Sequence, residues 1–425
     1  MPAIDLIVII LALGLLVASL ASIVVWWIAL HRIVRTARTL PNAAHGVAIA
    51  DATPTDQSLC VVIPAHNEAD EIRDLIESLK EQDHPSLRVV LALDRCTDDT
   101  RARAEAAIAA GAEATTLFEI VEIDHCPDDW AGKVHAAWSG VTRSTLAAGA
   151  HHVAFTDADC RFHTSCLRAT VALLEHRGID FLSLHSDQSS NDWFERAAQP
   201  VACMELVRQY PLMRANRYDE NARPFANGQF MLFRKAAYDA IGGHEAVREH
   251  LLEDIAFARL VRTTGHRGGL FVSGGMLRCK MYDSWSAFRR GWKRIYTESA
   301  NRKSTRLRQA AFRLRIAASV LPVFSLLALV TWWPFWHDAA LWKQLVAIAI
   351  HGSAVLMWAT ASIAFARAGT IPWRTFPQWP LGAWLVADIL AEAARDLEDG
   401  TPTEWGGRVY QRADRGPVRT QGGAA

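Results

Sequence analysis

The amino-acid sequence predicts an α/β domain with a mainly parallel β-sheet, held to a membrane by one helix before it and two after it. Two observations support this prediction. Through residues 56–284, short apolar runs alternate with amphipathic helical patterns, and this βαβ order is typical of parallel sheets. On both sides of that segment lie almost uncharged stretches that are long enough to cross a bilayer.

Residues 1–31 form the predicted N-terminal transmembrane anchor. Residues 4–30 carry one charged side chain and are otherwise almost entirely apolar. A cleaved signal peptide usually has a basic start and a shorter apolar core. Here the basic residues follow the apolar stretch, at Arg32, Arg35 and Arg38. The pattern therefore favours a helix that is retained in the membrane.

Two further membrane helices are predicted within residues 316–367, with buried core helices as the alternative. The aromatic residues at 332–336, between the two apolar stretches, resemble an interfacial belt. Basic residues cluster before these helices and after the first one. The positive-inside rule then predicts a multi-pass protein of the cell (inner) membrane, with the middle segment and the C-terminus in the cytoplasm.

Residues 285–315 form a predicted basic amphipathic segment at the membrane surface, with a solvated basic helix as the alternative. Its apolar side chains recur at helical spacing opposite basic ones, as in helices that bind anionic membranes. They are Trp285, Phe288, Trp292 and Ile295. Residues 368–425 are predicted to form a C-terminal interfacial segment and a polar tail, and the stretch 380–390 within them is predicted to be interfacial or re-entrant.

Composition and motifs argue against several classes of protein. The 45 basic and 45 acidic residues balance, so no net charge favours a nucleic-acid partner. The seven cysteines are scattered singly and fit reduced, structural roles in the cytoplasm. The chain has no GxGxxG or GxxxxGK[ST] motif, which disfavours ordinary dinucleotide-binding and P-loop proteins.

The first four strands of the sheet alternate with three helices. The first strand is an apolar run stopped by Pro64, and the helix after it has apolar positions at amphipathic spacing. The predicted strands are residues 59–63, 89–93, 116–123 and 153–155. The predicted helices are residues 68–82, a segment capped at 97–100 that continues to 110, and 133–148.

Polar side chains follow all four of these strands. They are Pro64 and Glu68, then Asp94, then Lys133, then Asp157 and Asp159. The carboxyl ends of parallel strands meet at one edge of the sheet, where ligands bind. Asp157 and Asp159 point the same way because side chains alternate, and two carboxylates suit a divalent ion that holds a diphosphate. Each residue alone fits a turn, a helix start or the surface, but the set fits a nucleotide.

The order of these motifs resembles the GT-A core of family 2 glycosyltransferases. The matching segments are 61–68 (VVIPAHNE), Asp94, 130–133 (WAGK), 157–159 (DAD), 225–232 (FANGQFML), 241–244 (IGGH) and 253–254 (ED). The set is most similar to hopene-associated glycosyltransferases, with ceramide glucosyltransferases as more distant relatives. The resemblance covers residues 56–300, and the flanking membrane helices also match.

The resemblance implies a membrane-bound, inverting enzyme that moves a single sugar from a nucleotide-sugar, expected to be a UDP-sugar, to the hydroxyl of a lipid or isoprenoid-type acceptor. The implied donor-binding residues are Pro64, Glu68, Asp94, Lys133 and Asp157, and Asp157 and Asp159 would hold Mg2+ or Mn2+. Asp254 or Glu253 would be the general base. The choice stays open because adjacent helical residues face different directions.

The acceptor is less well defined by the sequence. The candidate residues on the acceptor side are Asn227, Gly228, Gln229, His244, Arg290 and Trp292, although a loop position without function fits His244 equally well. Residues 191–214 fit either a core helix or an interfacial helix at a lipid entrance. Residues 288–292 (FRRGW) depart from the Gln-x-x-Arg-Trp sequence of processive polysaccharide synthases, which argues against a polymer channel. Transfer to a polyprenyl phosphate and an inactive GT-A membrane scaffold are the alternatives.

Overall fold

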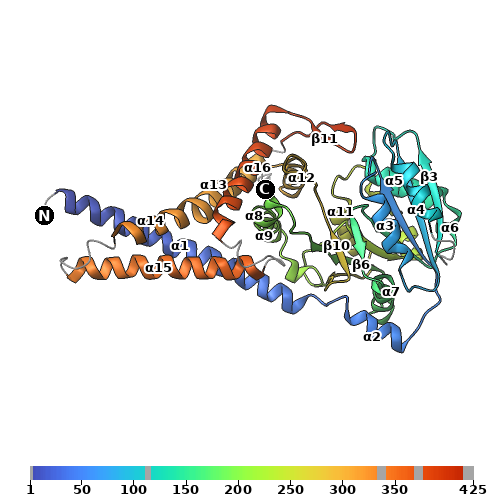
Figure 1. Cartoon of the computed structure of the whole chain (residues 1–425), viewed down its shortest axis with the longest axis horizontal. Helices are drawn as coiled ribbons and strands as arrows, with labels where there is room; N and C mark the ends of the chain where they lie inside the picture. Colours follow the sequence, from blue (N-terminus) through green and yellow to red (C-terminus); the bar gives the residue numbers. More distant parts are fainter. Residues whose placement is uncertain (1–2, 111–115, 333–340, 368–376, 415–425) are drawn as a thin grey trace, which may run out of the picture.

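The structure, a computed structural model, describes residues 3–110, 116–332, 341–367 and 377–414. A globular body lies at one end of an elongated molecule, and three helices extend from it side by side (Figure 1). They are α1 (Ala3–Thr39), α14 (Leu321–Trp332) and α15 (Leu341–Arg367). The predicted aromatic belt at 333–336 lies outside the described residues.

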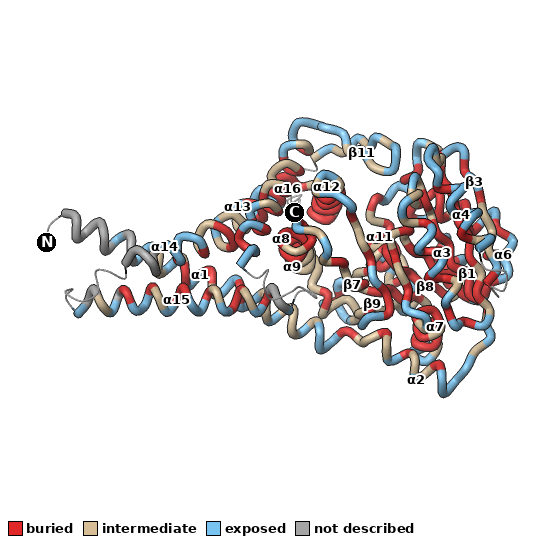
Figure 2. Tube along the Cα trace, in the orientation of Figure 1, coloured by how far each residue is buried: buried red, intermediate tan, exposed pale blue. Residues whose placement is uncertain are grey.

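Three segments of the described chain are long and apolar enough to cross a membrane, namely Leu13–Thr39, Ser304–Leu327 and Ala347–Ala364. Large apolar side chains point outward along this bundle, and much of its surface is exposed (Figure 2). Val17 is 66% exposed on α1, Phe324 57% on α14 and Val355 60% on α15. Soluble proteins rarely expose so much contiguous apolar surface, so the three predicted membrane helices agree with the structure.

The body contains a seven-stranded sheet in the order β3-β2-β1-β4-β8-β6-β9. Its strands are β1 (Leu59–Ala65), β2 (Leu87–Asp94), β3 (Leu117–Ile123), β4 (His152–Thr156), β6 (Phe181–His185), β8 (Phe230–Arg234) and β9 (Gly268–Val272). Strands β1 to β4 pair in parallel, as do β6 and β9, whereas β8 runs antiparallel to both of its neighbours. The prediction of a mainly parallel sheet is confirmed.

Helices cover both faces of the sheet because its central strands are apolar on both sides. Val61 and Ile63 of β1 pack under α3 (Ile72–Lys80), α4 (Thr100–Ala109) and α7 (Cys166–His176). Cys60 and Val62 pack on the other face, under α5 (Gly132–Arg143) and α11 (Glu253–Thr263).

The helix predicted at 133–148 is in fact two helices. The first, α5, ends at Arg143, and α6 (Thr145–Ala148) begins after Ser144. The Ser144 hydroxyl accepts the backbone N–H groups of Leu146 and Ala147. This N-cap interaction competes with a continuous helix.

The amphipathic segment predicted for the membrane surface packs its main apolar face inside the protein. It forms α12 (Trp285–Ser299) and α13 (Ser304–Arg313), which contact α16 (Trp379–Asp399). Phe288 and Trp292 are 0% and 2% exposed within this cluster. Lys293 on the basic face bonds Asp396 of α16 at 2.7 Å. Sequence periodicity gave the two faces correctly, and α16, a helix with acidic side chains, packs against both of them.

The region predicted as a polar tail folds back towards the α/β domain. After α16, which contains residues 380–390, strands β11 (Thr403–Trp405) and β12 (Arg408–Tyr410) form an antiparallel hairpin. Gly406 and Gly407 connect them with φ of 55° and 68°. Two successive positive φ values are typical of a tight type I′ hairpin turn.

Candidate active site

The loops after β1 and β2 lie together at the carboxyl edge of the sheet. Asn67 and Arg95 adopt left-handed backbone conformations there, with φ of 57° and 47°. The Asn67 side chain accepts the backbone N–H of Thr97 at 2.8 Å, and the backbone N–H of Glu68 donates to Thr100 at 2.8 Å. These bonds fix two consecutive strand ends against each other.

Asp94 lies at the end of β2 and is 2% exposed. Arg95 binds its carboxylate through two nitrogens, with Nε 2.9 Å from Oδ1 and Nη2 2.6 Å from Oδ2. His66 Nδ1 lies 2.6 Å from the Asp94 carbonyl oxygen. Sequence reasoning found Asp94 but missed Arg95, because a charged residue after a strand is usually exposed.

Glu68, Asp157 and Asp159 form a cluster of carboxylates beside these loops. Burial, followed by the charges of Asp159 and Asp157, raises the pKa of Glu68 to about 8. Burial, followed by the charge of Asp157, raises the pKa of Asp159 to about 7. Carboxylates that repel one another at close range, all offering hard oxygen atoms, are a suitable donor set for Mg2+ or Mn2+.

Lys133, near the start of α5, connects this cluster to the start of α11. Its Nζ lies 2.7 Å from Asp157 Oδ1 and 2.8 Å from Glu253 Oε1. Burial alone would lower the pKa of Lys133, but the two carboxylates outweigh burial and raise it. The lysine therefore stays charged at the centre of the site.

Gly228 brings the backbone close to the charged side chains of Lys133, Glu253 and Asp254. Its backbone N–H donates to Asp254 Oδ2 at 2.9 Å. A Cβ at position 228 would lie 3.2 Å from Lys133 Nζ, 3.3 Å from Glu253 Oε1 and 3.4 Å from Asp254 Oδ2. Such crowding leaves little room for a side chain, so the glycine allows Asp254 and Lys133 to share one corner of the site.

The two adjacent acids at the start of α11 have different properties. Burial would raise the pKa of Glu253, but the neighbouring charge and hydrogen bond of Lys133 lower it. Burial and then the charge of Glu253 raise the pKa of Asp254 to about 6. Asp254 can therefore exchange a proton near neutral pH, whereas Glu253 is held as a carboxylate by Lys133.

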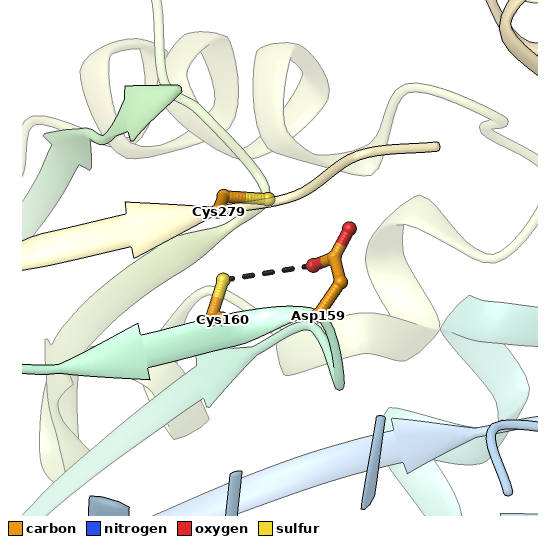
Figure 3. Close-up of side chains that lie close together, drawn as sticks. All are labelled: Asp159, Cys160 and Cys279. Carbon is orange, nitrogen blue, oxygen red and sulfur yellow. Dashed lines mark hydrogen bonds between the residues drawn. The ribbon is translucent and has the colours of Figure 1, made fainter. Parts of the chain in front are cut away.

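Two thiols lie against Asp159, which sequence spacing gave no means of predicting. Cys160 on β5 (Cys160–Phe162) and Cys279 on β10 (Leu277–Cys279) are paired across antiparallel strands. Their sulfur atoms and an Asp159 oxygen all lie within 4.8 Å of one another (Figure 3). Burial raises the pKa of both thiols, so they remain protonated, and Cys160 Sγ donates to Asp159 Oδ1 at 3.7 Å.

Asn227 and Gln229 belong to a buried polar network between β8 and the end of β6. The Gln229 amide nitrogen donates to Cys279 Sγ at 2.8 Å, and its oxygen accepts from Asn227 at 3.0 Å and Gln188 at 3.1 Å. The Ser186 hydroxyl also donates to this oxygen. This network lies directly beside Gly228.

The structure buries His244 behind the charged groups of this site, near enough for Glu253 and Lys133 to influence its pKa. His244 is 1% exposed, with Nδ1 2.8 Å from Tyr238 Oη and its ring packed on Phe155. Burial lowers its pKa to about 3, so it is a neutral core residue. Trp292 is likewise in the core, and Arg290 is exposed on α12. Helical spacing identified Trp292 as apolar but could not say what it packs against.

An apolar cavity of about 690 Å³ connects the membrane helices to the polar network. Its walls come from α1, from α9 (Gln199–Gln209) and from the helical turn η3 (Leu314–Val320). Trp26, Ile33 and Ala317 line its membrane side, and Ser186 and Gln188 line its inner side. Residues 191–214, predicted as a core helix or a lipid entrance, pack in a core cluster and also line this cavity.

A second, polar cavity of about 810 Å³ lies between α11, α12 and α13. It is lined by Arg208, Arg259, Arg302, Arg306, Arg313 and Arg412. The acidic residues in its wall are Glu249 and Glu298. It shares Arg208 and Arg313 with the apolar cavity, so an apolar and a cationic compartment adjoin at the membrane end of the body.

The sequence and the structure of this chain are both similar to those of known glycosyltransferases. The family described as "Glycosyl transferase family 2" matches residues 60–242. The chain is 26% identical over 279 residues to a 4,4'-diaponeurosporenoate glycosyltransferase of Staphylococcus aureus strain bovine RF122, covering 64% of this chain and 68% of that protein. The corresponding protein of strain MRSA252 is 24% identical over 277 residues, with the same shares covered.

Two solved structures are also similar to this chain. One is the mannosyltransferase PcManGT from Pyrobaculum calidifontis in complex with GDP-Man and Mn2+, which is 16% identical with a TM-score of 0.44 and covers 90% of this chain and 98% of its own. The other is S. aureus TarS 1–349 in complex with UDP-GlcNAc, which is 13% identical with a TM-score of 0.39, covering 84% and 97%.

Proposed function

We propose that this chain, a glycosyltransferase whose residues 60–242 belong to glycosyl transferase family 2, transfers one sugar from a nucleotide-sugar to a lipid at a membrane surface. The family assignment and the order of the sheet strands confirm the GT-A fold expected from the sequence. The arrangement of charged groups around Gly228 supports the proposed transfer to a lipid. Lys133, Glu253 and Asp254 converge on Gly228, and Lys133 also binds Asp157 of the carboxylate cluster, beside the polar end of a cavity that leads to the membrane helices.

The donor is proposed to be a UDP-sugar bound along the carboxyl edge of the sheet. Pro64, Glu68 and Asp94 would contact the nucleoside half, and Lys133 and Asp157 the diphosphate half. Asp157 and Asp159 would hold Mg2+ or Mn2+, which neutralises charge on the leaving diphosphate when bound. The mutual repulsion of the clustered carboxylates supports a cation at this position.

Asp254 is the proposed general base and Glu253 a positioning residue. With a pKa of about 6, Asp254 is mostly ionised at pH 7 and still basic enough to accept a hydroxyl proton. Glu253 is engaged by Lys133 at 2.8 Å, which fixes the lysine beside Asp157. Attack by the deprotonated hydroxyl on the far side of the anomeric carbon then inverts its configuration.

The acceptor is proposed to be a lipid or isoprenoid-type alcohol in the apolar cavity. A chain-like ligand could keep its apolar part between α1 and η3 and present its polar end near Gln188. The two curated relatives are named for an isoprenoid-type substrate, 4,4'-diaponeurosporenoate, which supports this class. Basic residues within or just after the three membrane segments, Arg32, Arg313 and Arg367, also line the cavity and favour a cytoplasmic catalytic domain.

Transfer to a phosphate-bearing lipid, such as a polyprenyl phosphate, is the second candidate function. Arg259 and Arg306 of the polar cavity favour it, because guanidinium groups bind phosphate with matched geometry, whereas its other four arginines pair with Glu205 or Glu298. Arg259 on α11 belongs to the polar cavity alone, so Arg259→Gln separates the two candidates. The substitution should weaken transfer to a phosphate-bearing lipid and leave transfer to a neutral alcohol unchanged.

The test is a product assay with purified full-length protein in lipid nanodiscs. UDP- and GDP-sugars are combined with neutral isoprenoid alcohols or polyprenyl phosphates, and products are detected by mass. We expect a mass increase of a single sugar, from one donor class, that disappears with EDTA and returns with Mg2+ or Mn2+. Donor turnover that is insensitive to EDTA would contradict the proposed metal role. The absence of any turnover would favour an inactive scaffold.

A further inference from the structure

We propose that the β11–β12 hairpin forms the outer wall of the nucleoside end of the donor site, with Tyr410 and Arg408 as positioning residues for donor binding. This inference rests on the proposed function, since it assigns a role at the same site. The hairpin comes from the C-terminal region, yet its contacts are with loops of the α/β domain that follow β1 and β3.

Tyr410 contacts the segment that carries Lys133. Its hydroxyl oxygen accepts the backbone N–H of Gly132 at 3.0 Å. A Cβ on Gly132 would lie 3.7 Å from this hydroxyl, 3.6 Å from Asp94 Oδ2 and 3.3 Å from Arg95 Nη2. The Tyr410 hydroxyl and the buried Asp94 carboxylate therefore approach the same backbone position, at the first turn of α5.

Arg408 holds the loop that precedes Gly132. Its guanidinium donates to the carbonyl oxygens of Cys126 at 3.1 Å and Pro127 at 2.8 Å, and to the Asp128 carboxylate at 3.2 Å. Only 13% of the Arg408 side chain is exposed. A nearly buried cation with three oxygen partners fixes the path of the chain between β3 and Lys133.

The turn of the hairpin lies on His66. A Cβ at Gly407 would lie 2.7 Å from His66 Nε2, so the backbone touches the imidazole and leaves no space for a side chain. His66 Nδ1 in turn contacts the Asp94 carbonyl oxygen at 2.6 Å. The hairpin tip thus reaches the loops after β1 and β2, where the nucleoside is proposed to bind.

Helix α12 holds the base of the hairpin. The guanidinium of Arg294 lies 3.7 Å from the centre of the Trp405 ring, and Arg412 pairs with Glu298 at 3.0 Å. Arg294 and Glu298 both lie on α12, which packs on α16. A hairpin fixed at its base and lying on the donor loops at its tip is suited to hold those loops in a binding conformation.

Alternation along β12 supplies a matched control. Arg408 and Tyr410 face the α/β domain, whereas Val409 between them is 61% exposed. Val409→Ala therefore changes the same strand without touching the donor loops. Tyr410→Phe removes one hydroxyl and keeps the ring, so the hairpin should still fold.

The experiment measures binding of UDP and GDP, each with Mn2+, to full-length wild-type protein, Tyr410→Phe, Gly407→Ala and Val409→Ala. For the nucleotide that the wild type binds, we expect affinity to fall about fivefold for Tyr410→Phe, the usual effect of losing one hydrogen bond. Gly407→Ala should weaken binding more, and Val409→Ala should equal the wild type. In transfer assays, the donor KM should rise with little change in the acceptor KM.

The outcomes distinguish the inference from the proposed function. If the wild type binds neither nucleotide, the proposed function is wrong and the inference falls with it. If the wild type binds and the Tyr410 and Gly407 variants bind equally well, the inference alone is overturned. Equal rises in donor and acceptor KM would also overturn it, because they would indicate general loosening of the structure.

Discussion

The proposed donor edge and the proposed acceptor cavity of this protein are assembled in different ways. The donor edge takes its residues from the consecutive ends of β1, β2 and β4, and parallel topology places these ends together. The cavity takes its walls from Val25 on α1, the α9 region and Arg367 at the end of α15, which are far apart in the sequence. The position of the donor edge follows from the order of the parallel strands. The shape of the cavity depends instead on how helices that are far apart in the sequence pack together.

The comparison explains which residues could be predicted from the sequence. Asp94, Asp157 and Lys133 follow strands or open a helix in a regular α/β order, so their meeting at one edge was predictable. The partners that complete the site were not, because Tyr410 and Cys279 reach it through tertiary contacts without a sequence signal.

The errors have the same cause. His244 was assigned to the acceptor side from its place beside two glycines and Trp292 from its place in the 288–292 segment, and neither position identifies the neighbours of the side chain. Tyr238 and Phe155 enclose His244, and Phe288 and Tyr296 pack on Trp292. The apolar face of α12 was correctly predicted. The sequence pattern did not indicate that α16 packs against it.

Asp254→Asn should lower activity the most, because Asp254 lies between the proposed donor edge and the proposed acceptor cavity. Loss of a general base lowers kcat by roughly 10²–10⁴-fold, while the affinity for UDP with Mn2+ should stay near the wild-type value. Steady-state kinetics and nucleotide binding check this prediction. A variant with normal kcat would show that Asp254 is not the base.

Asp159→Asn should damage the donor half selectively. Removing one proposed ligand of the cation should lower kcat/KM roughly 10²-fold, the range found when a group that stabilises transition-state charge is removed. The concentration of Mn2+ needed for half-maximal activity should rise at the same time. An unchanged Mn2+ requirement would remove Asp159 from the metal site even if activity fell.

Activity should also depend on pH through Asp254. Because its pKa is raised to about 6 by burial and by Glu253, the carboxylate is protonated below pH 6 and cannot accept the hydroxyl proton. At saturating Mn2+, kcat should be roughly tenfold lower at pH 5 than on the plateau above pH 7. A profile that is flat between pH 5 and 7 would count against this assignment.

Ala317→Phe should affect the acceptor half alone. The larger side chain fills part of the cavity between α1 and η3, so the acceptor KM should rise about tenfold, as for a misfit of a few methylene groups. The donor KM should not change. Val323→Phe is the matched control, since Val323 is 45% exposed on the outer face of α14. Equal effects of both substitutions would place the acceptor elsewhere.

The hairpin has a consequence for the biogenesis of the enzyme. Tyr410 and its partner Gly132 are separated by 278 positions in the chain, and all three membrane segments are translated before Tyr410. When the last of these helices has been synthesised, the residues of the proposed donor loops are already in the chain but their outer wall is not. On the proposed function, the nascent chain would therefore bind the sugar donor poorly until all three apolar helices are complete.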